Sequence, residues 1–167
     1  IDCQVRLVEA RARTYVARRR QMTGPVGCGL CGVESLELAA PALPRIARAD
    51  LAAVSPQAIG EAVAAMAGQQ DLSRLTRAVH AAAFFRAGSE PGSDPVVTRE
   101  DVGRHNALDK VAGHLARIGI DPREGFLTIT SRVSVELIQK AARMGCGLIA
   151  AVSAPTALAI GEAETAG

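Results

Sequence analysis

Two short stretches of the chain contain the residue types that carry out chemistry. The first, residues 27–32, reads Gly-Cys-Gly-Leu-Cys-Gly and sets Cys28 and Cys31 two residues apart. An exposed thiolate can attack, accept and release a partner, and the glycines give its loop conformational freedom. The second stretch, residues 100–110, combines carboxylates, an imidazole, an amide and cationic side chains. Both stretches point to a chemical function.

The Cys-x-x-Cys spacing is compatible with four kinds of site. Structural zinc usually takes four ligands, and beyond this pair the chain offers only Cys3, Cys146 and three histidines. A dithiol oxidoreductase places such a pair at a helix N-terminus, whereas glycines flank this one. A persulfide carrier needs a thiolate that visits two partners, which a glycine-lined loop allows. An inert structural pair is the fourth possibility.

The three histidines differ in their sequence surroundings. His105 has charged and amide neighbours on both sides, although Asp101 or Asn106 could serve simply as helix caps. His80 precedes three alanines, a pattern typical of a core histidine, and His114 falls on the surface of a predicted helix. The residues alone therefore leave a functional and a structural interpretation of His105 open.

Composition and length bound the class of protein. The chain has 167 residues, enough for a single domain, and is 49% hydrophobic with only 2% aromatic residues, so its core must consist mainly of Ala, Val, Leu and Ile. The net charge of +2 is not typical of a nucleic-acid-binding protein. No apolar run of about eighteen residues and no signal peptide are present, which favours a cytoplasmic location without membrane partners.

The predicted elements indicate an α/β domain. Short strands are expected over residues 5–8 and 14–17, a helix begins at Ser55-Pro56 and ends at Gly68, and residues 80–85 are ambiguous between helix and strand. Strands over 96–98, 126–130 and 148–153 then alternate with helices over 106–118, 133–144 and after Pro155. This alternation predicts a largely parallel sheet whose carboxyl ends gather the polar residues 99–105, 131–132 and 153–156.

Five segments, in order, resemble motifs of the formate dehydrogenase accessory sulfurtransferase family, FdhD: residues 27–32 (GCGLCG), 79–82 (VHAA), 100–110 (EDVGRHNALDK), 131–136 (SRVSVE) and 152–156 (VSAPT). The resemblance implies a cytidine-deaminase-like three-layer α/β sandwich with a mobile Cys-x-x-Cys loop, assembled as a homodimer. It implies a sulfurtransferase that takes persulfide sulfur from a cysteine desulfurase. The sulfur is delivered to the molybdenum or tungsten bis-pyranopterin guanine dinucleotide cofactor of formate dehydrogenase.

The resemblance also assigns site residues. Cys28 takes the role of the persulfide cysteine, with Cys31 as its partner. A pocket for the cofactor, or for a guanine nucleotide that mimics it, is expected to include His80, Asp101, Arg104, His105, Asn106, Asp109, Lys110, Ser131, Arg132, Ser134 and Glu136. Arg104 and Arg132 suit the cofactor's phosphates. Family members carry further segments at both ends, so residues 1–167 are interpreted as a single-domain fragment.

Two alternatives remain open. A non-covalent chaperone for the molybdenum cofactor would need the pocket residues but not Cys28. A zinc-dependent deaminase needs a His-x-Glu motif followed by Pro-Cys-x-x-Cys, but here Ala82 takes the place of the glutamate and the cysteine pair precedes His80. Deamination is therefore disfavoured, and we expect no zinc site.

Overall fold

The structure, a computed structural model, describes residues 6–17, 42–46, 54–90 and 92–167. It divides into two units, residues 1–42 and 43–167, each described here by itself. Cys28 and Cys31 lie outside the described residues, so the predicted loop conformation stays a prediction.

In the first unit, α1 (Glu9–Ala17) is a helix. The predicted strand over residues 14–17 is therefore wrong, and residues 6–8 of the other predicted strand have no regular structure. Thr14, Tyr15 and Val16 favour strands by propensity, but propensity is a weak determinant. Glu9 lies in the first helical turn and forms an ion pair with Arg13 four residues later, an arrangement that supports a helix.

The second unit is built on a four-stranded sheet: β1 (His80–Arg86), β2 (Val97–Asp101), β3 (Gly125–Ile129) and β4 (Ile149–Ala151), in the order β2-β1-β3-β4. β3 and β4 are parallel, whereas β1 is antiparallel to both β2 and β3. The sheet is therefore mixed rather than largely parallel. β2, β3 and β4 still run in one direction, so they end at the edge where β1 begins, which we call the carboxyl edge.

The ambiguous segment 80–85 forms the central strand β1 because five consecutive apolar residues, 81–85, are buried there between two helical layers. Ala81, Ala83 and Phe85 contribute to one apolar cluster, while Ala82 and Phe84 contribute to another on the opposite face. A strand covered on both faces has no polar alternation, so periodicity could not distinguish it from a helix.

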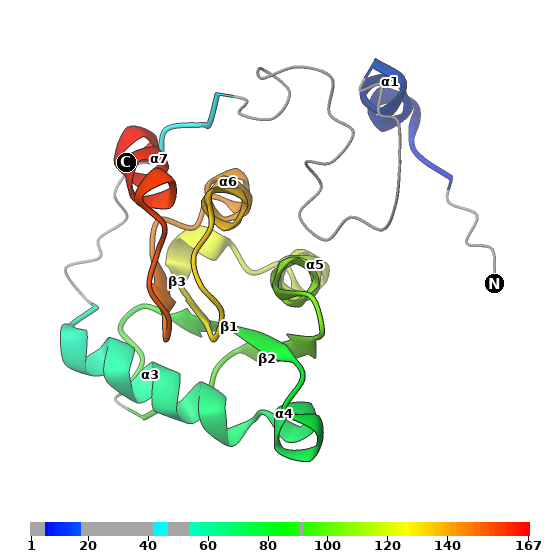
Figure 1. Cartoon of the computed structure of the whole chain (residues 1–167). Coiled ribbons are helices and arrows are strands. Elements are labelled where there is room, and N and C mark those ends of the chain that lie inside the picture. Colours follow the sequence, from blue (N-terminus) through cyan, green and yellow to red (C-terminus); the bar gives the residue numbers. More distant parts are fainter. Residues whose placement is uncertain (1–5, 18–41, 47–53, 91) are drawn as a thin grey trace. The chain divides into compact units, whose positions relative to one another are not determined.

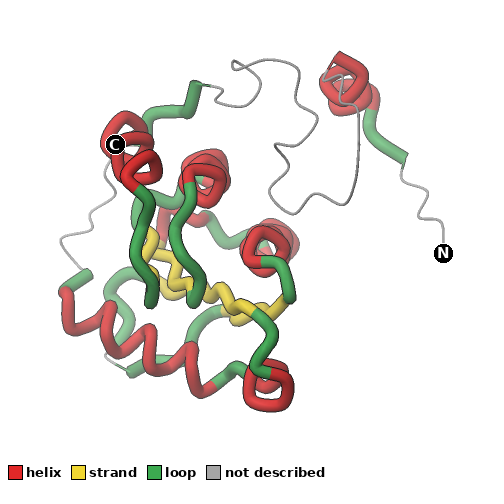
Figure 2. Tube along the Cα trace, viewed as in Figure 1, coloured by secondary structure: helices red, strands yellow, loops and turns green. Residues whose placement is uncertain are grey.

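Helices cover both faces of the sheet (Figure 1 and Figure 2). On one face lie α3 (Pro56–Gly68) and the short α4 (Asp71–Thr76). On the other lie α5 (Arg104–Ile118), α6 (Val135–Met144) and α7 (Ala157–Ala166), while a 3-10 turn, η2 (Pro122–Glu124), leads into β3. This order of helix layer, sheet and helix layer confirms the α/β class, whereas the cytidine-deaminase-like relationship stays a prediction.

The helix boundaries follow the expected local chemistry. The Ser55 hydroxyl accepts a hydrogen bond from the Ala58 amide at 3.1 Å, and Pro56 occupies the first position of α3. Gly119 and Gly145 end α5 and α6 with φ of 70° and 88°, the left-handed conformation that glycine adopts without strain.

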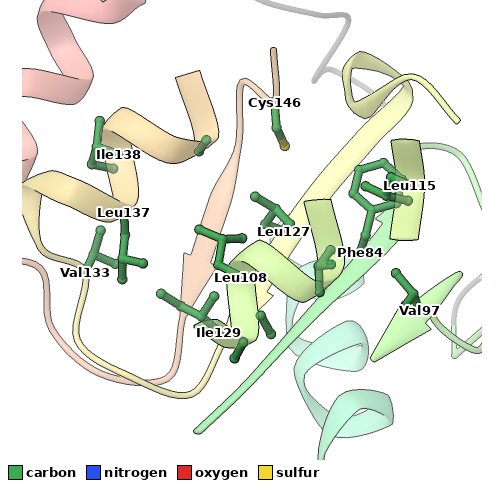
Figure 3. Close-up of a cluster of buried hydrophobic side chains, with 14 of the residues drawn as sticks. Phe84, Val97, Leu108, Leu115, Leu127, Ile129, Val133, Leu137, Ile138 and Cys146 are labelled. Carbon is green, nitrogen blue, oxygen red and sulfur yellow. The ribbon is translucent and has the colours of Figure 1, made fainter. Parts of the chain in front are cut away.

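The larger core cluster lies between the sheet and helices α5 to α7 (Figure 3). Phe84, Leu108, Leu127 and Leu137 are fully buried there. Met66 of α3 belongs to a smaller apolar cluster, in which the Phe85 and Phe126 rings stack with their centroids 5.5 Å apart. No helix among the described residues has the length and apolar character to span a bilayer.

Candidate binding site at the carboxyl edge

The predicted pocket residues come from four segments that meet at or next to the carboxyl edge. His80, the first residue of β1, pairs with Asp101, the last residue of β2. Ser131 and Arg132 follow β3, and α5 and α6 begin at Arg104 and Val135. A parallel sheet was expected to bring these segments together, and the mixed sheet does so as well. The reason is that β1, which runs opposite to β2, β3 and β4, begins at the edge where those three strands end.

The turn between β2 and α5 is held together by the Asp101 carboxyl group. Its Oδ1 accepts hydrogen bonds from the Gly103 amide at 2.8 Å and the Asn106 side-chain amide at 3.1 Å. Its Oδ2 lies 2.6 Å from the Lys110 ammonium, which also donates to the Glu100 carbonyl at 3.0 Å. The bonds from Lys110, Gly103 and Asn106 lower the pKa of Asp101 from 3.8 to about 2, although partial burial opposes them.

Gly103 caps the N-terminus of α5 at a crowded position. An added Cβ would lie 3.2 Å from the Asn106 amide nitrogen and 3.5 Å from Asp101 Oδ1. No side chain among the described residues caps α5 at this point. The first amides of the helix therefore remain uncapped by a side chain, and the helix dipole favours an anion there.

Next to this N-terminus is a group of buried polar atoms, which we call the His105 cluster. His105 is only 4% exposed, and neither of its ring nitrogens has a hydrogen-bond partner among the described residues. The same holds for Arg104 Nε and Glu136 Oε2. Burial, and secondarily the Arg104 charge, lowers the pKa of His105, while Glu136 acts in the opposite direction. Its imidazole is therefore neutral at pH 7 and can both donate and accept a hydrogen bond.

Glu136 lies in the first turn of α6, and its Oε2 is one of the buried atoms without a hydrogen-bond partner among the described residues. Burial has the largest effect on its pKa and raises it, but its own backbone amide and the charges of His105 and Arg104 are among the influences that lower it, and the net pKa lies below its ordinary value. An acidic side chain in the first turn of α6 interacts favourably with the helix dipole. Among the described residues, neither α5 nor α6 has a side-chain hydrogen bond that caps its N-terminus.

Asp109 lies one turn further along α5, where its carboxylate oxygens are 2.5 and 2.7 Å from the Lys140 ammonium on α6. Glu136 and Lys140 lie four residues apart in α6, a spacing that suits a helical ion pair, but the structure pairs Lys140 with Asp109. Asp109 therefore joins two helices.

Beyond β3, Ser131 is buried and its hydroxyl donates to the Arg132 carbonyl at 3.1 Å, while the Arg132 side chain is exposed. The Thr156 amide donates to the Val133 carbonyl at 3.0 Å, and Val133 forms a parallel bridge with Pro155. The chain segments after β3 and β4 thus stay paired past the ends of both strands, which fixes the backbone that carries Arg132.

One structural role was missed in the sequence. The Glu100 carboxylate accepts hydrogen bonds from the Leu72 and Ser73 amides, each at 2.8 Å, and so fastens the start of α4 to β2. Its only signal in the sequence is an acidic residue within a strand, and its partners lie 27 and 28 residues away.

Within the described ranges, no group of three His, Cys, Asp or Glu side chains is arranged to hold a metal ion. Because Cys28 and Cys31 lie outside those ranges, the expectation that the protein has no zinc site stays a prediction.

Comparison with known proteins places these features in a family. The family model described as "FdhD/NarQ family" matches residues 2–167. The sulfur carrier protein FdhD of Agrobacterium fabrum is 49% identical over 170 residues, which cover 99% of this chain and 59% of that protein. The protein of the same name from Bordetella petrii is 48% identical over 164 residues, covering 98% and 57%. The chain thus matches less than two thirds of the length of these relatives.

The fold also has a solved counterpart. A crystal structure of a candidate formate dehydrogenase accessory protein from Desulfotalea psychrophila superimposes with a TM-score of 0.65 at 24% identity, covering 76% of this chain and 51% of that one. At this identity the likeness concerns the fold alone. The family model and the curated relatives confirm the resemblance found in the sequence motifs, and the chain belongs to the FdhD/NarQ family.

Proposed function

We propose that this chain is the part of a sulfur carrier that accepts persulfide sulfur on Cys28 and presents it to a cofactor destined for formate dehydrogenase. The observation that carries the proposal is the near-complete match of the chain to relatives named sulfur carrier protein FdhD, at 49% and 48% identity. The Cys-x-x-Cys loop supplies the thiol such a carrier needs.

Loading of sulfur requires only thiol chemistry. The Cys28 thiolate attacks the outer sulfur of a persulfide on a cysteine desulfurase, the sulfur–sulfur bond of the donor breaks, and the donor's cysteine leaves as a thiolate. Cys28 then carries the transferred sulfur, with no external oxidant or reductant. Cys31 is the nearby thiol that assists the transfer or resolves the persulfide.

The carboxyl edge is the proposed binding site for the cargo, the molybdenum or tungsten bis-pyranopterin guanine dinucleotide. Its phosphates match the side-chain-uncapped N-terminus of α5 and the guanidinium groups of Arg104 and Arg132. The polar atoms of the His105 cluster, which have no hydrogen-bond partner in the part of the chain that the structure describes, support this assignment, because buried polar groups normally have partners. We further propose that the protein acts in the cytoplasm as a homodimer.

Intact mass measurement tests the sulfur-carrier role. The full-length protein, incubated with a cysteine desulfurase and cysteine, should gain one sulfur atom that a reductant removes. Cys28→Ala should abolish the gain and Cys31→Ala should reduce it. Cys146→Ala is the matched control, because Cys146 is only 3% exposed and burial raises its thiol pKa, which makes it a poor nucleophile.

Three outcomes would contradict the proposal. Sulfur loading that survives Cys28→Ala but is lost in Cys31→Ala would make Cys31, and not Cys28, the persulfide cysteine. Loading lost only with Cys146→Ala would place the sulfur on the buried thiol. A wild-type protein that binds a guanine nucleotide but never gains sulfur would instead be a non-covalent cofactor chaperone.

A further inference from the structure

We propose that Asp101 and Lys110 are positioning residues, which hold Gly103 and the N-terminus of α5 toward the anionic cargo without contacting the cargo themselves. The inference rests on the proposed function, since it concerns how the same edge is organised. Under this proposal, some residues of the motif at 100–110 shape the site, and others remain available to a ligand.

The hydrogen bonds of Asp101 carry the first step. Its carboxylate receives the Gly103 amide, the Asn106 amide and the Lys110 ammonium, at 2.6 to 3.1 Å. The Lys110 ammonium in turn contacts both Asp101 and the Glu100 carbonyl. Both charged groups are therefore engaged within the turn, and a direct contact with a ligand would have to replace these bonds.

The helical period explains why one short motif has two roles. Residues four apart share a face of a helix, so Asn106 and Lys110 both point to the Asp101 turn. His105 and Asp109, also four apart, lie on a neighbouring face, where Asp109 meets α6 through Lys140. The unpartnered ring nitrogens of His105 contrast with the fully engaged side chain of Asp101.

Asp101 influences ligand binding through the backbone that it holds in place. Its bond to the Gly103 amide fixes the residue that caps α5, and Arg104 is the next residue in the chain. Lys110 also neutralises a carboxylate that would otherwise repel an anion at this helix end. Loss of either partner should loosen the same turn.

A charge-removing substitution distinguishes positioning from direct contact by the sign of its effect. If Lys110 bound the anionic ligand directly, Asp101→Asn would free its ammonium and tighten binding. If Asp101 and Lys110 position the turn, Asp101→Asn weakens binding. Lys110→Met weakens binding under both interpretations, so Asp101→Asn is the decisive variant.

We would measure guanosine diphosphate affinity by calorimetry on the full-length wild type and on Asp101→Asn, Lys110→Met and the double variant. Each single variant should bind about threefold to tenfold more weakly, on the scale of one lost hydrogen bond. The double variant should bind no more weakly than the worse single one, because both substitutions break one network. Lys140→Met is the matched control, since it also removes a lysine from an ion pair on this side of the sheet, and it should change affinity less than twofold.

Amide hydrogen exchange, measured without ligand, separates failure of this inference from failure of the proposed function. Exchange at Gly103 and the next residues should quicken in Asp101→Asn and Lys110→Met but not in Lys140→Met. Tighter nucleotide binding by Asp101→Asn, or unchanged exchange at Gly103, would overturn the positioning role. A wild type that binds no nucleotide but shows the expected exchange would refute the cargo assignment and retain Asp101 and Lys110 as organisers of the turn.

Discussion

Replacing Lys110 with methionine should raise the pKa of Asp101 and destabilise the fold at neutral pH. In the folded protein this pKa is about 2, compared with 3.8 for an ordinary aspartate, and the hydrogen bond from Lys110 is its largest cause. Methionine retains much of the apolar stem of the lysine and removes its charge. The substitution therefore tests the interaction rather than the packing.

The magnitude follows from linkage between protonation and folding. A pKa change of one unit corresponds to about 1.4 kcal/mol, so the full depression at Asp101 represents roughly 2 kcal/mol. Lys110 contributes only part of it, and its side chain is 48% exposed, compared with 20% for Asp101, so solvent screens the pair. We expect Lys110→Met to cost about 1 kcal/mol at pH 7.

The direction of the pH dependence is fixed by the sign of the change. Because the pKa of Asp101 is lower in the folded than in the unfolded state, its stabilisation is complete above pH 3.8 and is lost as the pH falls towards 2. Urea unfolding at pH 7 measures the cost, and a carbon-13 titration of the Asp101 carboxyl group measures its pKa. An Asp101 pKa that stays near 2 in Lys110→Met, or one that rises equally in Lys140→Met, would refute this reasoning.

Three further predictions concern the site and the sheet beneath it. Arg104→Ala or Arg132→Ala should weaken guanosine diphosphate binding by roughly 1.5 to 3 kcal/mol in calorimetry, the scale of a lost charge-assisted hydrogen bond, while sulfur loading measured by mass stays normal. Gly125→Ala should destabilise the protein by about 3 kcal/mol or more in urea unfolding, because its Cβ would lie 1.9 Å from the Phe85 carbonyl oxygen. Burial lowers the pKa of His105, so the wild type should lose stability as the pH falls below about 6.5, and His105→Gln should lose less between pH 7 and 5.

The location of the site could be predicted from the sequence, because it depends on where strands end. Residues 97–101, 125–129 and 149–151 form strands close to the predicted ranges, and the polar residues after them gather at one edge. The direction of β1 could not be predicted, because its buried residues 81–85 are all apolar and specify neither its partners nor its orientation. The strand predicted over residues 14–17 is instead part of the helix α1, because strand propensity at Thr14 and Val16 is a weak determinant and the Glu9–Arg13 pair supports a helix.

The roles within the site were harder to predict than its location. The family resemblance assigns Asp101, Arg104, His105, Asn106, Asp109 and Lys110 alike to a pocket. Helical spacing shows which of these residues share a face but not what that face contacts. The partner of Asp101 within the turn and the partner of Asp109 on α6 depend on tertiary structure. Those contacts separate residues that are already satisfied from His105 and Arg104, which retain unpartnered nitrogens among the described residues.

We expect the same contacts to favour the proposed anionic cargo at an edge that also carries acidic groups. Asp101, whose carboxylate accepts a hydrogen bond from the Gly103 amide at the N-terminus of α5, is paired with Lys110. Pairing cancels the field of the carboxylate over a short distance, so it contributes little repulsion at the ligand. The guanidinium groups of Arg104 and Arg132 and the N-terminus of α5 favour negative charge at this edge. We therefore expect selectivity for the proposed anionic cargo to depend on the pairing of Asp101 with Lys110 rather than on a simple excess of basic residues.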